Sequence, residues 1–425
     1  MTLIKTSLLN GIAVVIKILT LLGINKILAV YVGPAGYAAI GQLQNAMQLI
    51  TTIASGAVST GVTKYTAEYS DDEVKQHGVW SAATSIMLWS TLVVSVAVFF
   101  LSPLIAQELL GNVDYSVVLQ IFSVSLIFFV ANGLVLSILN GKKEVKLYVM
   151  ANIAGSFISL MLVAILTVTS GLFGALVSLA LYQSISFIAT VKFCFGLKWF
   201  KISNFFGKVD RVNVLNLLKY ALMAITSAVC VPLSHMMVRG YLSDNFGVEA
   251  AGYWEALWRM SSSYLLVVTT TLSLYYLPKL SELKRFIDIK KEVVSGYKLI
   301  LPVTAFCGVI VYLLRDIIVV ILFSSEFLPA RELFGWQMVG DTLKIGSWLL
   351  AYVMVSKAMF KTFIVTEILA AGSFVFFTMF LTTIYGVKGV AMAHAVTYLF
   401  YWAIVSVAVY CFYKSKKFRL SDADE

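Results

Sequence analysis

The sequence predicts an all-α membrane protein with about twelve membrane-spanning helices, arranged in two parallel six-helix lobes around a central cleft. The chain of 425 residues is 60% hydrophobic and only 13% charged, whereas soluble domains are roughly a quarter charged. Its mean hydropathy is +0.89, and charge-free runs such as 86–101 and 374–384 occur along its length. Short segments also recur at an offset near half the chain length, which indicates a duplicated helical unit.

A helix needs about 20 mostly apolar residues to cross a bilayer, and it satisfies its own backbone polar groups there. A spanning barrel would show ~10-residue alternating strands, and this sequence lacks that alternation. Candidate spans are 8–31, 38–61, 79–101, 116–138, 147–169, 173–193, 216–241, 252–277, 296–314, 333–355, 362–384 and 389–412. The first is too long, and with Lys17 and Lys26 too charged, for a cleaved signal peptide. The short apolar stretch 317–323 is predicted to lie at the membrane interface.

Lysine and arginine residues are divided unequally between the two sides of this predicted topology. Outside the spans, 21 lie on the side of the N-terminus, and three, Arg315, Arg331 and Lys388, lie on the other. The positive-inside rule places the richer side in the cytoplasm, so both termini are predicted to be cytoplasmic. The net charge of +10 follows from these loops. The sequence has no soluble module with a basic face, so it does not indicate nucleic-acid binding.

An internal duplication accounts for the two lobes. Four matches share an offset of 215 to 217 residues: AGY at 35–37 and 251–253, AGSF at 154–157 and 371–374, Gly171 and Gly174 with Gly386 and Gly389, and Lys146 with Lys361. Six spans in each half give both halves the same orientation, so the repeats are parallel. We predict an N-terminal lobe at 1–193, a basic cytoplasmic amphipathic linker at 194–215, and a C-terminal lobe with a cytoplasmic tail at 216–425.

Ionisable residues inside spans are costly unless they face water or a partner, and this chain keeps a small set. The cations are Lys17, Lys26, Arg239, Arg259 and Lys344, and the acids are Glu255, Asp341 and Glu367. Glu255 and Arg259 have i,i+4 spacing, and Asp341 and Lys344 have i,i+3 spacing. Each pair either neutralises itself and holds helices together or lines a water-filled cleft. Lys26 is alternatively a residue that snorkels to the interface.

The excess of cations over acids predicts an anionic substrate, because arginine and lysine are the usual partners of phosphate. We therefore take the five cations as candidate substrate-binding residues, and the three acids as cavity acids or ion-coupling groups. The sequence has no P-loop and no hydrolase or metalloprotease motif. Its four cysteines and three histidines are scattered without metal-ligand spacing. We expect a protein that is not an enzyme, with no catalytic residues, cofactor or metal.

Three segments resemble the Wzx-type flippases: VGPAGY at 32–37, GVTKY at 61–65 and LFGWQMVGDTLK at 333–344. The likeness covers essentially the whole chain. Six of the candidate residues lie in matching contexts, namely Lys17, Lys26, Arg239, Asp341, Lys344 and Glu367. Glu255 and Arg259 correspond less clearly to the family pattern. The chain is most similar to the enterobacterial common antigen and O-antigen branch of these flippases.

This resemblance implies a member of the multidrug/oligosaccharidyl-lipid/polysaccharide exporter superfamily, with twelve helices in two lobes. It implies a protein of the bacterial inner membrane that serves lipopolysaccharide biosynthesis. The implied substrate is an undecaprenyl-pyrophosphate-linked O-antigen repeat unit, moved from the cytoplasmic to the periplasmic leaflet by alternating access. Besides this substrate and the lipid bilayer, an O-antigen polymerase and a chain-length regulator are candidate partners.

Two alternatives remain at the level of the sequence. A cation-coupled multidrug exporter would use the same scaffold, although a cation-rich cleft disfavours cationic drugs. A membrane-embedded polymerase or ligase would need a large periplasmic loop with reactive residues, and the longest loop on that side is only about 315–332. An ATP-driven mechanism on this chain is disfavoured because the sequence has no P-loop.

Overall fold

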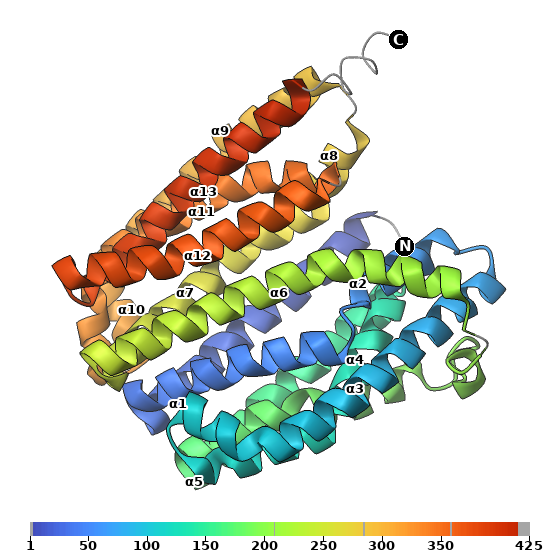
Figure 1. Cartoon of the computed structure of the whole chain (residues 1–425), viewed down its shortest axis with the longest axis horizontal. Coiled ribbons are helices and arrows are strands. Elements are labelled where there is room, and N and C mark those ends of the chain that lie inside the picture. Colours follow the sequence, from blue (N-terminus) through green and yellow to red (C-terminus); the bar gives the residue numbers. More distant parts are fainter. Residues whose placement is uncertain (1–2, 208, 284, 358, 415–425) are drawn as a thin grey trace. The chain divides into compact units, whose positions relative to one another are not determined.

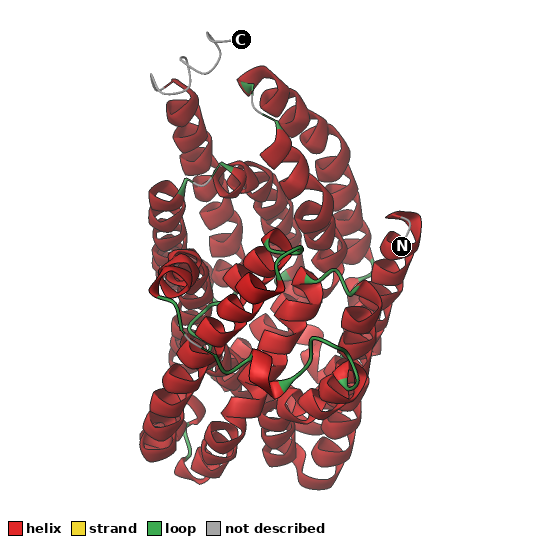
Figure 2. Ribbon diagram, turned by 90° about the vertical axis from the view of Figure 1, so that its right-hand side faces the viewer, coloured by secondary structure: helices red, strands yellow, loops and turns green. Residues whose placement is uncertain are grey.

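The computed structural model describes residues 3–207, 209–283, 285–357 and 359–414, and within these ranges the chain is helical and contains no strand (Figure 2). In chain order the elements are α1 Leu3–Ala54, α2 Ser59–Glu68, α3 Glu73–Leu110, η1 Val113–Tyr115, α4 Ser116–Gly141, α5 Val145–Cys194, η2 Ile202–Asn204, α6 Arg211–Phe246, α7 Val248–Thr271, η3 Leu272–Tyr276, α8 Leu277–Glu282, α9 Phe286–Leu313, α10 Arg315–Leu322, η4 Ser325–Glu332, α11 Phe334–Ser356, α12 Phe360–Tyr385 and α13 Lys388–Lys414. The expected tail beyond 414, and the loop cations Lys208 and Lys284, lie outside the described residues.

Two of the long helices are each interrupted by a glycine with positive φ. In α1 the backbone breaks at Gly33, with φ 66° and ψ −178°, and the next residue is Pro34. In α5 it breaks at Ser170 and Gly171, the glycine having φ 55° and ψ −134°. Residues with a side chain strongly avoid this region of backbone space. Each long helix therefore consists of two spans joined by a tight turn, as the predicted pairs 8–31/38–61 and 147–169/173–193 require.

The number of spans agrees with the predicted twelve. In the described part of the chain, eight helices are long and apolar enough to cross a membrane. Dividing α1 and α5 at their breaks raises this number to ten. The other two predicted spans, 216–241 and 252–277, fall on α6 and α7, which have 36 and 24 residues. The second span is shorter than predicted, because α1 ends at Ala54 and α2 is a separate helix.

The chain divides into two compact units, Met1–Met236 and Met237–Glu425. In unit 1, α5 packs against α1 and α4, and α3 packs against α4 and α1 (Figure 1). In unit 2, α11 packs against α9 and α13, and α13 also packs against α12. The first part of α6 belongs to unit 1, where Leu217 lies against Gly61. The linker at 194–215 as a boundary between lobes remains a proposal.

The same glycine turns recur in both halves of the chain. Gly247, between α6 and α7, has φ 91°, and Gly386, between α12 and α13, has φ 60°. They correspond to Gly33 and Gly171. The second glycine of the repeated pair, Gly174 in one half and Gly389 in the other, lies in each case against the backbone of the preceding span. A Cβ would lie 1.8 Å from the Leu166 carbonyl oxygen at Gly174, and 2.5 Å from that of Leu381 at Gly389. The duplication therefore extends from sequence to backbone geometry.

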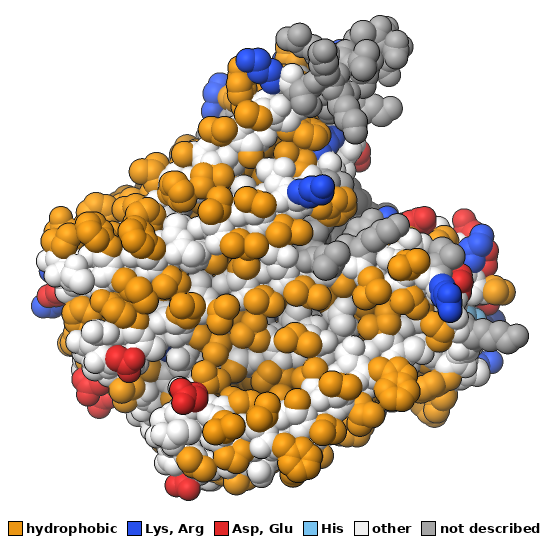
Figure 3. All heavy atoms as spheres, in the orientation of Figure 1, with side chains coloured by type: hydrophobic (Ala, Val, Ile, Leu, Met, Phe, Trp, Pro, Cys, Tyr) orange, Lys and Arg blue, Asp and Glu red, His pale blue; other side chains and the backbone are white. Residues whose placement is uncertain are grey.

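Apolar side chains cover the outer sides of the helices. Trp89 is 71% exposed and Phe100 75% exposed, as expected of helices that face lipid. On the face shown in Figure 3, hydrophobic side chains cover most of the surface and charged side chains gather near helix ends. The exception is α11, in which 61% of the most apolar window is buried, against 17% in α9 and α12. Polar groups on α11 therefore lie in the interior of unit 2.

We expect Gly171→Ala and Gly386→Ala each to reduce stability by about 1–3 kcal/mol, because alanine is strained at these backbone angles. The matched control is Gly372→Ala in α12, where an added Cβ meets nothing within 4 Å. Thermal unfolding of the purified protein in detergent measures the effect. Equal midpoints for all three variants would contradict this interpretation of the turns.

Candidate functional site

One carboxylate joins two guanidinium groups in unit 2, one buried and one partly buried. Arg239 on α6 is only 1% exposed, and its Nη2 donates a hydrogen bond to Glu255 Oε2. Arg259, one turn after Glu255 on α7, donates from Nε to Oε1 at 2.7 Å. The turn at Gly247 reverses the chain, so that α7 runs back along α6 and Glu255 comes within reach of Arg239. The predicted ion pair of Glu255 with Arg259 is thus present, and Arg239 is added to it.

Asp341 on α11 is fully buried and held by groups from three helices. Its Oδ2 accepts a hydrogen bond from the Tyr264 hydroxyl of α7 at 2.7 Å. Its Oδ1 lies 3.0 Å from His394 Nε2 of α13 and also accepts from Gln337 Nε2 at 3.2 Å. This network accounts for both carboxylate oxygens. Asp341 is therefore tied to α7 and α13.

A small residue allows His394 to reach Asp341. A Cβ at Gly340 would lie 2.2 Å from His394 Cδ2 and 3.1 Å from the backbone nitrogen of Ala395. Glycine at position 340 lets α13 approach α11 closely enough for the imidazole to contact the carboxylate, as small residues do at membrane helix interfaces. His394 is a residue that the sequence analysis missed as part of the site. Its only signal there was an ionisable group inside a predicted span.

Lys344 lies among aromatic rings. Its Nζ is 4.4 Å from the ring centroid of Trp258, 5.0 Å from that of Trp348 and 5.5 Å from that of Tyr398. In the described ranges no carboxylate lies within 4.0 Å of this ammonium group, so the sequence-level alternative of a direct Asp341–Lys344 salt bridge is not realised. Cation–π attraction stabilises such an arrangement. Lys344 thus differs from the other two predicted cations of this unit, Arg239 and Arg259, which both contact Glu255.

The aromatic rings connect Lys344 to the Asp341 network. Trp258 and Tyr398 both pack edge-on against the His394 imidazole, with ring centroids 5.5 Å and 4.9 Å away. Trp258 also neighbours Trp254, whose ring lies 5.5 Å from the Arg239 guanidinium carbon. The ion cluster of Glu255, the Asp341 network and Lys344 therefore form one continuous polar and aromatic core within unit 2.

The other predicted residues are more dispersed. Glu367 on α12 accepts a hydrogen bond from the Tyr401 hydroxyl at 2.9 Å. Lys17 on α1 is exposed and Lys26 is half-buried, and both belong to unit 1. Unit 2 holds three predicted cations and three predicted acids, so the predicted excess of two positive charges rests on Lys17 and Lys26. Their assignment to the same site as Lys344 remains a prediction.

The sequence matches a protein-family model described as polysaccharide biosynthesis protein over residues 3–284. Among curated proteins it is similar to the Lipid III flippases of Escherichia coli (strain K12) and Shigella flexneri. Each is 31% identical over 408 residues, which covers 95% of this chain and 97% of the relative. These matches confirm the resemblance to flippases, and both relatives are flippases by name.

Solved structures of the same fold are transporters as well. An inward-facing multidrug resistance MATE family transporter of the MOP superfamily superposes with a TM-score of 0.79 at 13% identity, covering 94% of this chain and 96% of that one. The Lipid II flippase MurJ in an inward closed conformation gives 0.71 at 15% identity, covering 96% and 87%. At these identities the likeness shows the fold, and it confirms the predicted helical class.

We expect Glu255→Leu to reduce stability by about 3–5 kcal/mol, because it removes the counter-charge that Arg239 and Arg259 share in the protein interior. The double variant Glu255→Leu/Arg239→Met should be more stable than Glu255→Leu alone, because it removes one of the buried charges. Thermal unfolding of the four proteins of this cycle measures the coupling. Simple addition of the two single effects would count against the shared carboxylate.

We expect Gly340→Ala to reduce stability by about 1–3 kcal/mol, because the new methyl group overlaps the His394 ring. In a His394→Ala background, which lacks the overlapping ring, Gly340→Ala should cost less stability than it does in the wild-type protein. Gly133→Ala on α4, where an added Cβ meets nothing within 4 Å, is the control. If Gly340→Ala costs as much in the His394→Ala background as in the wild-type protein, the proposed packing role of Gly340 is wrong.

Proposed function

This chain belongs to the family of polysaccharide biosynthesis proteins, and from that premise we propose that it is a flippase for a lipid-linked oligosaccharide. The observation that carries the proposal is the 31% identity to the Lipid III flippases over 95% of the chain. The buried charged core of unit 2 supports it, because ionisable groups are kept inside a membrane protein mainly for transport or for structure. The aromatic surroundings of Lys344 suit a ligand with both charged and apolar parts.

We further propose that the substrate is an undecaprenyl-pyrophosphate-linked O-antigen repeat unit. The protein would move it from the cytoplasmic to the periplasmic leaflet of the bacterial inner membrane by alternating access. The distribution of Lys and Arg supports cytoplasmic termini. Transport before polymerisation would make an O-antigen polymerase and a chain-length regulator its functional partners.

The candidate residues divide into two roles in this proposal. Lys17, Lys26 and Lys344 contact the pyrophosphate, and the absence of a carboxylate within 4.0 Å of the Lys344 ammonium group, within the described chain, supports its inclusion. Arg239 and Arg259 contribute positive charge but are oriented by Glu255. Displacing such a buried guanidinium from its carboxylate is costly. We therefore assign the two arginines chiefly to positioning α6 against α7.

We propose Asp341, together with His394, as the ion-coupling group, with Glu367 as the second candidate. A carboxylate and an imidazole nitrogen 3.0 Å apart can share or exchange a proton directly. Asp341 also lies three residues before Lys344 on α11, so a change in its charge alters the potential at the ammonium group. Proton uptake at Asp341 would remove its negative charge and thereby strengthen the hold on an anionic substrate.

A multidrug exporter is the competing function, and the TM-score of 0.79 to a MATE transporter favours it at the level of fold. That neighbour shares only 13% of its residues with this chain, whereas the flippases share 31%. The two functions differ in what a deletion does. Loss of a flippase leaves lipid-linked units inside the cell, and loss of a drug exporter changes drug resistance.

In a strain that lacks the chromosomal gene, we expect Lys344→Met to reduce surface polysaccharide at least tenfold, because methionine fills the same space without the charge. Lys344→Arg should retain part of the activity. Lys361→Ala, an exposed lysine at the start of α12, is the control. Immunoblotting for surface polysaccharide at matched protein levels gives the result. Full activity of Lys344→Met would remove this lysine from the mechanism, and drug sensitivity without a polysaccharide defect on deletion would favour the exporter.

A further inference from the structure

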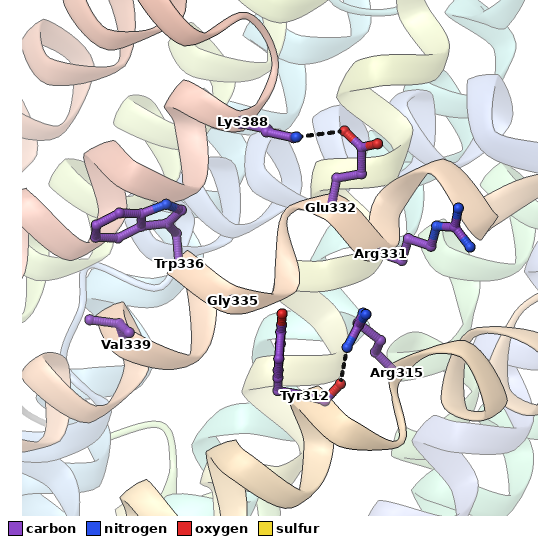
Figure 4. Close-up of a pocket in the computed structure, with 8 residues that line it drawn as sticks. All are labelled: Tyr312, Arg315, Arg331, Glu332, Gly335, Trp336, Val339 and Lys388. Carbon is purple, nitrogen blue, oxygen red and sulfur yellow. Dashed lines mark hydrogen bonds and ion pairs between the residues drawn. The ribbon is translucent and has the colours of Figure 1, made fainter.

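An open groove of about 680 Å³ lies at one end of unit 2 and shares no lining residue with the buried core. It is lined by the end of α9, the start of α10, the end of η4, and the first turns of α11 and α13 (Figure 4). The residues that matter for its chemistry are Tyr312, Arg315, Arg331, Glu332, Trp336 and Lys388. The opposite ends of α11 and α13 carry Lys357 and Lys414, so the groove lies on the other side of the unit from the lysine-rich loops.

The groove collects three cations and one acid. Arg315 donates from Nη1 to the Tyr312 carbonyl oxygen at 2.8 Å, and its guanidinium carbon lies 4.4 Å from the Tyr312 ring centroid. Lys388 forms an exposed ion pair with Glu332 at 3.1 Å. Within the described ranges, no carboxylate lies within 4.0 Å of Arg331. These four charges give the groove an excess of two positive charges.

These three cations are also all the loop cations that the topology assigns to this side of the membrane. Of the 24 lysine and arginine residues placed in loops, 21 are assigned to the other side. Arg315 and Arg331 come from the connection between α9 and α11, and Lys388 comes from the connection between α12 and α13, yet all three line one groove. All the loop cations assigned to this side therefore gather at one groove.

Helix dipoles add to this positive potential. Three helices begin at the groove: α10 at Arg315, α11 at Phe334 and α13 at Lys388. A helix N-terminus presents free N–H groups and partial positive charge to an anion. The C-terminus of α9 also lies here, but Arg315 already donates to its Tyr312 carbonyl oxygen. In α13 the N–H groups of Gly389 and Val390 already donate to the carbonyl oxygens of Gly386 and Val387, so the backbone contribution to anion binding comes chiefly from α10 and α11 and adds to that of the side chains.

The aromatic side chains of the groove place it at the level of lipid head groups. Trp336 is 44% exposed and Tyr312 41% exposed, both at helix ends. Tryptophan and tyrosine concentrate at the membrane–water interface. Figure 4 shows Trp336 on one side of Gly335, and Arg315 and Arg331 on the other. An apolar wall beside cationic groups matches a lipid, whose phosphate and acyl chain lie next to one another.

We propose that this groove binds the phosphate of a lipid head group in the leaflet opposite the lysine-rich loops. The site is separate from the buried core of unit 2, and its occupancy does not require that the protein transport a lipid-linked sugar. Arg331 and Arg315 contact the phosphate, and Lys388 exchanges its contact with Glu332 for one with the lipid. Trp336 packs against the glycerol and the first acyl carbons.

The test is binding of dioctanoyl phosphatidylglycerol to the purified full-length protein in a nonionic detergent, followed by native mass spectrometry. Each surface cation near an anionic lipid contributes about fivefold to binding, so Arg331→Ala alone should weaken binding about fivefold. The triple variant Arg315→Ala/Arg331→Ala/Lys388→Ala should abolish it. The triple variant Lys290→Ala/Lys291→Ala/Lys361→Ala removes the same charge from exposed lysines at the other end of the unit and should bind normally.

Two further probes separate the possible sources of the phosphate. Dioctanoylglycerol, which lacks the phosphate, should not bind, and inorganic pyrophosphate should bind far more weakly than the lipid. Equal affinity for pyrophosphate and the lipid would overturn the assignment to a lipid. Normal lipid binding by Arg331→Ala, a change at an exposed side chain that does not threaten folding, would overturn the site itself.

Discussion

The lack of water in the bilayer is the constraint on which this structure depends, because every buried charge must find its partner inside the protein. Unit 2 meets this requirement on α11, its most buried helix, and on the helices around it. Glu255 serves two arginines, Asp341 is held by groups from α7, α11 and α13, and Lys344 lies against three aromatic rings. The same contacts that satisfy these groups also fix how α6, α7, α11 and α13 pack.

Hydropathy, glycine spacing and helical periodicity were sufficient to predict the helical class, the twelve spans and the ion pair of Glu255 with Arg259. These features are local: each depends on residues within a few turns or on a repeat with a constant offset. The Asp341–His394 contact could not be predicted in this way, because it joins two residues that lie on different helices and 53 positions apart in the sequence. It depends on the close approach of α13 at Gly340, which only the packed structure reveals. The aromatic surroundings of Lys344 are equally non-local.

The structure also changes how the cation excess is understood. Counted over the sequence, five cations outnumber three acids, but in unit 2 the two groups are equal in number, and Glu255 contacts both arginines. Among the three candidate cations of unit 2, Lys344 is the one whose ammonium group has no carboxylate within 4.0 Å in the described chain. We propose that the arginines hold the scaffold of unit 2 and that Lys344 supplies charge that a pyrophosphate would meet.

The most direct measurement of the central claim is transport by the purified protein in liposomes. A lipid-pyrophosphate oligosaccharide labelled on its sugar is placed in both leaflets, the label in the outer leaflet is quenched, and protection of the remainder is followed in time. The account predicts that vesicles containing the protein lose this protection, whereas protein-free vesicles keep it. Equal protection in both kinds of vesicle, with the protein folded and inserted, would contradict the assignment as a lipid-linked oligosaccharide flippase.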